Sequence, residues 1–154
     1  MGLIITTGLV KIIFGDNRDC TPQNIGSIYH CLMILRNEKV TGLVLAGGRA
    51  RRMAGRDKGL IELAGQPMAH WVVERLVQQT ASVLISANRN IERYAELGFE
   101  VIRDADDGFL GPLAGISAGL TQTATPWLVT VPCDSPLLAD DLVVRLSGAV
   151  PVED

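Results

Sequence analysis

The chain has 154 residues, a length typical of one domain, and its 47% hydrophobic against 20% charged residues exclude a disordered chain. Its formal net charge of −3 argues against a protein that coats nucleic acid through the phosphates. The first apolar stretch, residues 2–14, falls short of the about 18 residues of a transmembrane helix. It also has no preceding cation and so makes a poor signal peptide.

Residues 1–38 lack the regular pattern of the rest of the chain. Residues 2–14 are β-like but irregular, 15–22 form a turn cluster, and 25–35 have no clean period. We interpret residues 1–38 as a divergent N-terminal extension, or as sequence translated from upstream of the natural start. The domain is then expected over 39–154. A packed strand and helix in residues 1–38 is the alternative.

From residue 40 onward, strand and helix patterns alternate. Short apolar runs predict strands over 41–46, 60–63, 82–85, 100–103 and 127–131. Helical spacing and start signals such as Pro67 predict helices over 68–79, 91–97, 112–123 and 139–146. A glycine-rich loop over 47–59 and a turn over 65–67 connect the first of these elements. The alternation predicts an α/β fold with a mostly parallel sheet, helices on both faces, and a ligand site beyond the carboxyl ends of the strands.

Charge is distributed unevenly along the chain. Five cations lie within residues 49–58, namely Arg49, Arg51, Arg52, Arg56 and Lys58. Residues 104–154 hold eight acids and one cation. A basic loop before an acidic remainder suits a site for an anion plus a divalent metal, although charge alone favours the simpler explanation of a solvated loop and a solvated acidic face.

The loop over 47–59 combines small and cationic residues directly after a predicted strand. Gly47 and Gly48 leave their backbone N–H groups free to wrap around an anion. Arg52 offers a planar fork for phosphate oxygens, and Lys58 offers a compact charge on a flexible arm. The loop has neither a Walker A pattern nor G-x-G-x-x-G. We interpret it as a phosphate-binding loop rather than an ordinary surface loop.

An ordered set of motifs extends over residues 40–146. The set comprises TGLVLAGGRARRM, DKGL followed by ELAGQP, SANRN, the aspartate of VIRD, GPLAG and PCDSP. In this order the motifs resemble the molybdenum cofactor guanylyltransferases, the MobA family. The glycine-rich motif alone would indicate only the wider nucleotidyltransferase group, whereas the ARRM context with ANR, GPLAG and PCDSP favours the guanylyl branch.

The resemblance implies a Rossmann-like, GT-A-like nucleotidyltransferase fold of three layers. It also implies Mg²⁺-dependent transfer of GMP from GTP to molybdenum-bound molybdopterin, with release of pyrophosphate. The implied catalytic residues are Lys58, Arg52 and Asp134, and Asp134 would bind the Mg²⁺ ion. The implied GTP-binding residues are Leu45, Ala46, Gly47, Gly48, Gly55, Lys58, Ser86, Asn88, Asp104 and Asp134. The family often has asparagine where Ser86 stands.

Several of these residues also have plain structural explanations. Asp134 follows an apolar strand, where an acid needs a partner or a metal, but it could be a turn or N-cap residue. Asp104 and Asn88 could likewise be turn formers. Gly111, Gly115 and Gly119 recur every four residues, so one helix face would admit either a nucleotide or close packing on the sheet.

The three cysteines, Cys20, Cys31 and Cys133, form no C-x-x-C pair. This excludes a disulfide framework and a zinc knuckle, and it is typical of a reducing cytoplasm. We expect Cys133 to be a small buried residue rather than a nucleophile.

Three hypotheses about function remain open. Family members continue well beyond position 154, where much of their acceptor pocket lies, so the chain is either a guanylyltransferase or an incomplete, non-catalytic nucleotide-binding domain. The third hypothesis is cytidylyl transfer, or nucleotidyl transfer to a sugar phosphate. GTP and molybdopterin are the implied substrates, with transient contacts to proteins of cofactor biosynthesis or molybdoenzyme maturation. Nucleic acid and membrane are not expected partners.

Overall fold

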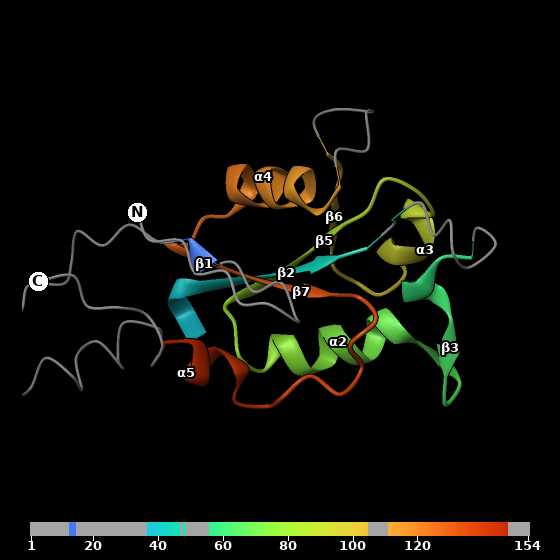
Figure 1. Ribbon diagram of the computed structural model, residues 1–154, viewed down its shortest axis with the longest axis horizontal. Coiled ribbons are helices and arrows are strands. Elements are labelled where there is room, and N and C mark those ends of the chain that lie inside the picture. The colour runs from blue at the N-terminus through green and yellow to red at the C-terminus, as the bar shows by residue number, and fades with distance from the viewer. Residues whose placement is uncertain (1–12, 15–36, 47, 49–55, 105–110, 148–154) are drawn as a thin grey trace, which may run out of the picture.

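The computed structural model describes residues 13–14, 37–46, 48, 56–104 and 111–147. Within these residues, five strands form one sheet in the order β1-β7-β2-β5-β6 (Figure 1). The strands are β1 (Ile13–Phe14), β2 (Val40–Leu45), β5 (Ser82–Ser86), β6 (Glu100–Ile102) and β7 (Trp127–Pro132). The pairs β2–β5, β2–β7 and β5–β6 are parallel, whereas β1 pairs antiparallel with β7. The predicted α/β fold with a mostly parallel sheet is confirmed.

Helices cover both faces of this sheet, which explains why its central strands are apolar runs without alternation. Figure 1 shows α4 (Pro112–Gln122) on one face and α2 (Met68–Val77) with α5 (Leu142–Ser147) on the other. Two apolar clusters result, one on each face: Val44, Val129 and Val131 pack toward α2, and Leu43 and Leu128 pack toward α4. The described residues also include two short helices, the α-helix α3 (Ile91–Ala95) and the 3₁₀ helix η1 (Asn37–Lys39).

Helix α2 is amphipathic in the way that its sequence predicts. Its buried residues are Ala69, Val72, Val73 and Leu76, which recur at three- and four-residue steps and form one stripe. Pro67 directly precedes the helix, where its missing N–H costs no helical hydrogen bond. Burying each of the larger side chains contributes about 1.5–3 kcal/mol, so this stripe fastens α2 to the sheet.

The glycines of α4 have the packing role that was one of their two interpretations. A side chain at Gly115 would overlap the Ser86 hydroxyl, and one at Gly119 would meet Leu43 Cδ2 at 2.6 Å. The helix therefore lies directly on β2 and β5. Gly111 differs from these two, because it is exposed and has a left-handed φ of +83° just before the helix begins.

The region between the glycine-rich loop and α2 differs from its prediction. A single strand was expected over 60–63 and a turn over 65–67. The structure instead has a 3₁₀ helix η3 (Lys58–Leu60), followed by a hairpin of β3 (Glu62–Leu63) and β4 (Gln66–Pro67). Ala64 and Gly65 both have positive φ, the geometry of a two-residue hairpin turn, so the turn lies earlier than predicted.

Part of the predicted N-terminal extension joins the sheet. Ile13 lies opposite Val129 and Phe14 opposite Leu128, so β1 covers the outer edge of β7. Apart from β1 and the start of η1, the extension lies outside the described residues. The boundary between 1–38 and 39–154 therefore stays a prediction. None of the helices in the described ranges has the length and apolar character needed to cross a bilayer.

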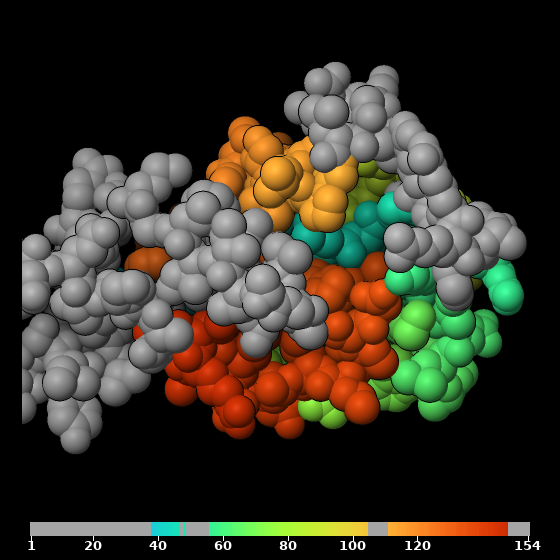
Figure 2. All heavy atoms as spheres, viewed as in Figure 1, coloured from blue at the N-terminus to red at the C-terminus, as the bar shows by residue number. Residues whose placement is uncertain are grey.

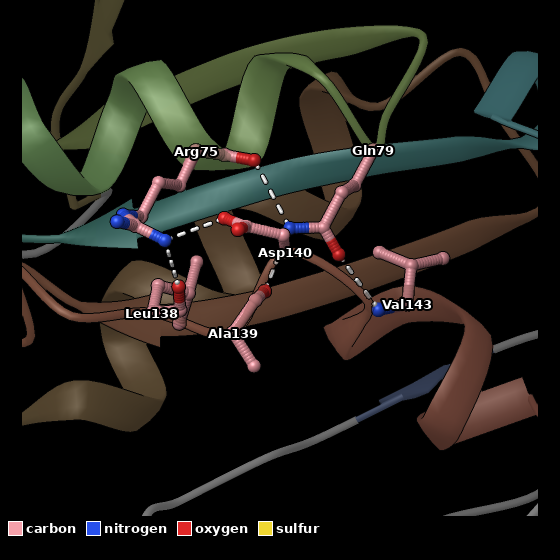
Figure 3. Close-up of polar contacts among 6 residues, drawn as sticks. All are labelled: Arg75, Gln79, Leu138, Ala139, Asp140 and Val143. Atoms are coloured by element: carbon pink, nitrogen blue, oxygen red, sulfur yellow. Dashed lines mark hydrogen bonds and ion pairs between the residues drawn. The ribbon is translucent and has the colours of Figure 1, made fainter.

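The chain after β7 is tied to α2 by a group of polar contacts (Figure 3). Gln79 donates to the carbonyl oxygens of Arg75 and Ala139 at 3.0 and 2.9 Å, and its Oε1 accepts from the Val143 N–H at 3.1 Å. Arg75 donates to the Leu138 carbonyl at 3.0 Å and pairs with Asp140. These contacts hold residues 138–141 in a non-helical conformation, and they explain why the last helix begins at Leu142 rather than at the predicted position 139.

We predict that Gln79→Leu lowers the free energy of unfolding by about 2–4 kcal/mol, because it leaves the buried Val143 N–H and the Ala139 carbonyl without their partner. Urea unfolding followed by circular dichroism measures the change. Gln122→Leu, at an exposed position at the end of α4, is the matched control. Equal stability of the two variants would show that these contacts do not hold the segment after β7.

Candidate functional site

The parallel strands β2, β5, β6 and β7 end at one edge of the sheet. Of the predicted site residues that the structure describes, Leu45 and Ser86 end strands β2 and β5, and Ala46, Asn88, Asp104 and Asp134 follow strand ends within two residues. Backbone hydrogen bonds continue past the strand ends: Ala46 N–H donates to Ser86 O at 2.8 Å, and Cys133 N–H donates to Leu45 O at 3.1 Å. Figure 2 shows the end of β2 (teal) at the surface between α4 and the segment after β7. Leu45 and Ala46 thus lie at the centre of this edge, and the exposed Gly48 follows them.

One end of the edge carries an ion pair between two predicted catalytic residues. Lys58 Nζ lies 3.0 Å from Asp134 Oδ2, although the two residues are 76 positions apart. Their side chains are 47% and 35% exposed. A pair this exposed adds little to stability, so a charged ligand could replace either partner at low cost.

The other end of the edge carries an amide–carboxylate pair. Asn88 Nδ2 donates to Asp104 Oδ2 at 2.6 Å, and the Asp104 N–H donates to Asn88 Oδ1 at 3.0 Å. Ser86 Oγ reaches Asp104 Oδ1 at 3.5 Å. Ser86 itself is 4% exposed and lies beneath Gly115 of α4. The structure therefore joins these three predicted residues, with Asp104 as a bound acceptor rather than a solvated turn acid.

The two ends are separated by the width of the central strands. Adjacent strands lie about 4.8 Å apart, and β5 and β2 stand between β6 and β7. The ends of β6 and β7, which carry Asp104 and Asp134, are therefore roughly 14 Å apart. Three further predicted residues, Gly47, Arg52 and Gly55, lie outside the described residues.

A third polar cluster, which the sequence analysis missed, adjoins Lys58. The Asp57 carboxylate accepts from Tyr94 Oη at 2.7 Å and from Asn90 Nδ2 at 2.9 Å, and Arg89 Nε lies 3.5 Å from it. The Asp57 side chain is 6% exposed. In the sequence, Asp57 is an acid among the five cations of residues 49–58. The sequence gives no indication that this acid is buried.

The residues present fit a divalent metal that arrives with phosphate. In the described part of the chain, no group of three or more His, Cys, Asp or Glu side chains gathers to hold a metal. Asp134 nevertheless offers a half-exposed carboxylate at the strand end. Mg²⁺ is commonly bound by one or two carboxylates together with substrate phosphates and water, and this donor set matches that description.

Cys133 lies beside the site but is unsuited to nucleophilic chemistry. It is 8% exposed, and burial raises the pKa of its thiol to about 12, with smaller contributions from the carboxylates of Asp134 and Asp57. A thiol with this pKa stays protonated at neutral pH, and the thiolate is the reactive form. The expectation of a small buried cysteine is confirmed.

Comparison with known proteins assigns the chain to a family. The model of the MobA-like NTP transferase domain matches residues 42–154. The chain belongs to this family. The matched range contains η3 and every strand and helix of the described residues except β1, η1 and the first two residues of β2. It therefore includes both ends of the candidate site.

Relatives within this family are similar over most of the chain. A molybdenum cofactor guanylyltransferase from Shewanella putrefaciens is 56% identical over 111 residues, which are 72% of this chain and 57% of the relative. One from Cupriavidus metallidurans is 54% identical over 122 residues, 79% of this chain and 60% of the relative. The chain thus spans under two thirds of the length of these curated relatives.

Solved structures share the fold of this NTP transferase domain. A CMP:2-keto-3-deoxy-manno-octonic acid synthetase in complex with CTP superposes with a TM-score of 0.59 at 20% identity, covering 70% of this chain and 45% of that chain. A nucleotidyl transferase from Methanothermobacter also has a TM-score of 0.59 at 20% identity, covering 71% and 56%. At this identity the likeness confirms the nucleotidyltransferase fold alone.

We predict that Cys133 in the folded protein reacts with iodoacetamide at pH 8 roughly 100-fold or more slowly than in the urea-unfolded chain, because a raised pKa leaves very little thiolate. Peptide mass spectrometry gives the rate at Cys133 separately from those at Cys20 and Cys31. Similar rates at Cys133 in the folded and unfolded chain would mean that its thiol is accessible and ionised.

Proposed function

We propose that this chain binds GTP together with Mg²⁺ at the carboxyl edge of its sheet. As the nucleotide-binding part of a molybdenum cofactor guanylyltransferase, it serves the transfer of GMP to molybdenum-bound molybdopterin. The observation that carries the proposal is the Lys58–Asp134 pair at the end of β7, in a chain of this family. The names of relatives 49–56% identical to the chain favour the guanylyl over the cytidylyl reaction.

We propose that the two ends of the edge bind different parts of one nucleotide. The exposed cation and acid at Lys58 and Asp134 suit the triphosphate and its metal, because a ligand can replace their mutual contact. Asn88 and Asp104, at the other end, offer amide and carboxylate groups suited to the hydrogen-bonding edge of a base or to a ribose. Leu45, Ala46 and Gly48 would line the path between these ends.

The chemical demands of the reaction explain this use of charge. A phosphate oxygen of the acceptor attacks the α-phosphate of GTP, pyrophosphate leaves, and negative charge accumulates on both groups. Mg²⁺ bound at Asp134 would supply positive charge to the phosphate oxygens. Lys58 adds a cation that orients and neutralises the triphosphate, and Arg52 is proposed for the same task. The protonated Cys133 thiol takes no covalent part.

The proposal extends to the setting of the reaction. The buried, free Cys133 and the widely spaced cysteines suit a reducing cytoplasm, which we propose as the location. Transient contacts with proteins of cofactor biosynthesis or molybdoenzyme maturation are proposed because the product must reach an acceptor protein.

For the metal, we predict that Asp134→Asn strongly reduces the Mg²⁺-dependent part of GTP binding while the melting temperature changes little, since the side chain keeps its shape and loses its charge. Calorimetric titration with GTP, with Mg²⁺ or with EDTA, measures this part. Asp141→Asn is the matched control, because it removes an exposed carboxylate that pairs with Arg145 away from the site. Binding of Mg·GTP by Asp134→Asn as tight as by the parent would make Asp134 a structural turn residue.

For the loop, we predict that Lys58→Ala weakens GTP binding by roughly 1.5–3 kcal/mol, the scale of a hydrogen bond to a charged group. Lys39→Ala, which removes an exposed lysine at the opposite edge of the sheet, should bind like the parent.

Parallel titrations of the parent chain with CTP and ATP test which base the site prefers. Pyrophosphate release that requires molybdenum-bound molybdopterin tests transfer. Tighter binding of CTP than of GTP would contradict the guanylyl assignment.

A further inference from the structure

The residue directly before Lys58 has the opposite environment to that of Lys58. The Lys58 side chain is 47% exposed, whereas that of Asp57 is 6% exposed and surrounded by donors. Both Asp57 oxygens are bound: Oδ1 by the Tyr94 hydroxyl, and Oδ2 by the Asn90 amide with the Arg89 guanidinium nearby. We call Asp57, Arg89, Asn90 and Tyr94 the Asp57 cluster. A buried carboxylate is costly unless its partners are placed well, so this arrangement needs a structural or functional reason.

Two members of the cluster are themselves held firmly. Tyr94 is fully buried on α3, and its ring belongs to the same apolar cluster as Val44 and Val131. Asn90 precedes α3 with a left-handed φ of +53°, a conformation that asparagine tolerates better than most residues. Its side chain is thereby directed at Asp57 rather than used as a helix cap, since it makes no cap hydrogen bond.

The residue after Lys58 is constrained by the same tyrosine. Gly59 is buried, and a side chain there would overlap the Tyr94 hydroxyl and meet Cys133 Cβ and Sγ at 3.1 Å. The backbone of η3 is therefore enclosed between Tyr94 and Cys133. Cys133 directly precedes Asp134, so Tyr94 lies at the junction between the segment that carries Lys58 and the segment that carries Asp134.

We propose that the Asp57 cluster is a positioning device for Lys58, with Tyr94 as its central residue. By holding the backbone on both sides of Lys58, it places Nζ beside Asp134. If the proposed function holds, it also reduces the backbone conformational entropy that is lost when Lys58 binds a triphosphate. Tyr94 acts through Lys58 and is not itself a catalytic residue.

The test on binding is a double-mutant cycle between Tyr94→Phe and Lys58→Met, measured by GTP titration in the presence of Mg²⁺ on the full 154-residue chain. Tyr94→Phe keeps the buried ring and removes the hydroxyl. We expect it to weaken binding roughly fivefold or more in the parent, and less than about twofold in the Lys58→Met background, because contacting groups are non-additive. Thr80→Val, which removes a buried hydroxyl bound to Leu76 O away from the site, should leave binding unchanged.

Equal losses in the two backgrounds would overturn the proposal, since Tyr94 would then support the fold without acting through Lys58. Parent-like binding by folded Tyr94→Phe would overturn it as well. Should Tyr94→Phe fail to fold, Asp57→Asn takes its place in the same cycle, because it keeps the side-chain shape and removes the charge that the cluster binds.

A second measurement needs no nucleotide and so separates this proposal from the proposed function. The N–H groups of Leu60 and Ile61 donate to Asp57 O and Lys58 O at 3.2 Å, and their hydrogen exchange reports the order of η3. We expect Tyr94→Phe to speed the exchange of these two amides roughly fivefold or more relative to Thr80→Val. Unchanged exchange would overturn the positioning role. Faster exchange in a chain that does not bind GTP would uphold the positioning role and refute the proposed function.

Discussion

The arrangement of the molecule depends on β2 being paired along both edges and covered on both faces. Its pairs with β5 and β7 use its backbone groups, and Leu43 and Val44 point into different apolar clusters. A strand enclosed in this way has little room for polar side chains. The one polar side chain of β2, that of Thr41, is buried near the amino end of the strand and hydrogen-bonded to Ser82 and Thr125. The polar groups of the candidate site therefore lie at or after the carboxyl ends of the strands, and parallel pairing brings four such ends to one edge.

At that edge, exposure separates polar groups that are available to a ligand from those that are not. The Lys58–Asp134 pair is partly in water, where its attraction is weak and its partners can be exchanged. The Asp57 carboxylate is almost fully buried, where removing one partner would leave a charge without compensation. These two neighbouring residues thus have different roles: Asp57 fixes the backbone, and Lys58 presents a positive charge to solvent and to Asp134.

Family membership and fold likeness carry different information about this chain. Structures at 20% identity share the fold of the chain and carry no information about its ligand or its chemistry. Relatives above 50% identity bear a single activity in their names, but the chain covers 57–60% of their length. The carboxyl edge of the sheet lies within the shared part, so the proposed nucleotide binding is the part of the activity that can be tested on this chain directly.

Local pattern was sufficient for most of the elements. Apolar runs predicted β2, β5, β6 and β7 to within a residue or two, and three- and four-residue spacing predicted α2. These predictions succeed because the side chains that face the core must be apolar, which sets the spacing of apolar residues along the sequence. The order of motifs also identified Lys58, Asn88, Asp104 and Asp134 as candidates.

Other features of the fold and site depend on tertiary contacts and could not be predicted from local pattern. The 3₁₀ turn at Lys58 and the late start of α5 depend on partners 35 or more residues away in the sequence, at Tyr94, Arg75 and Gln79. The burial of Asp57 likewise depends on tertiary contacts, since it requires α3 to bring Tyr94 to the carboxylate. The sequence alone does not show whether a carboxylate faces water or a tyrosine hydroxyl.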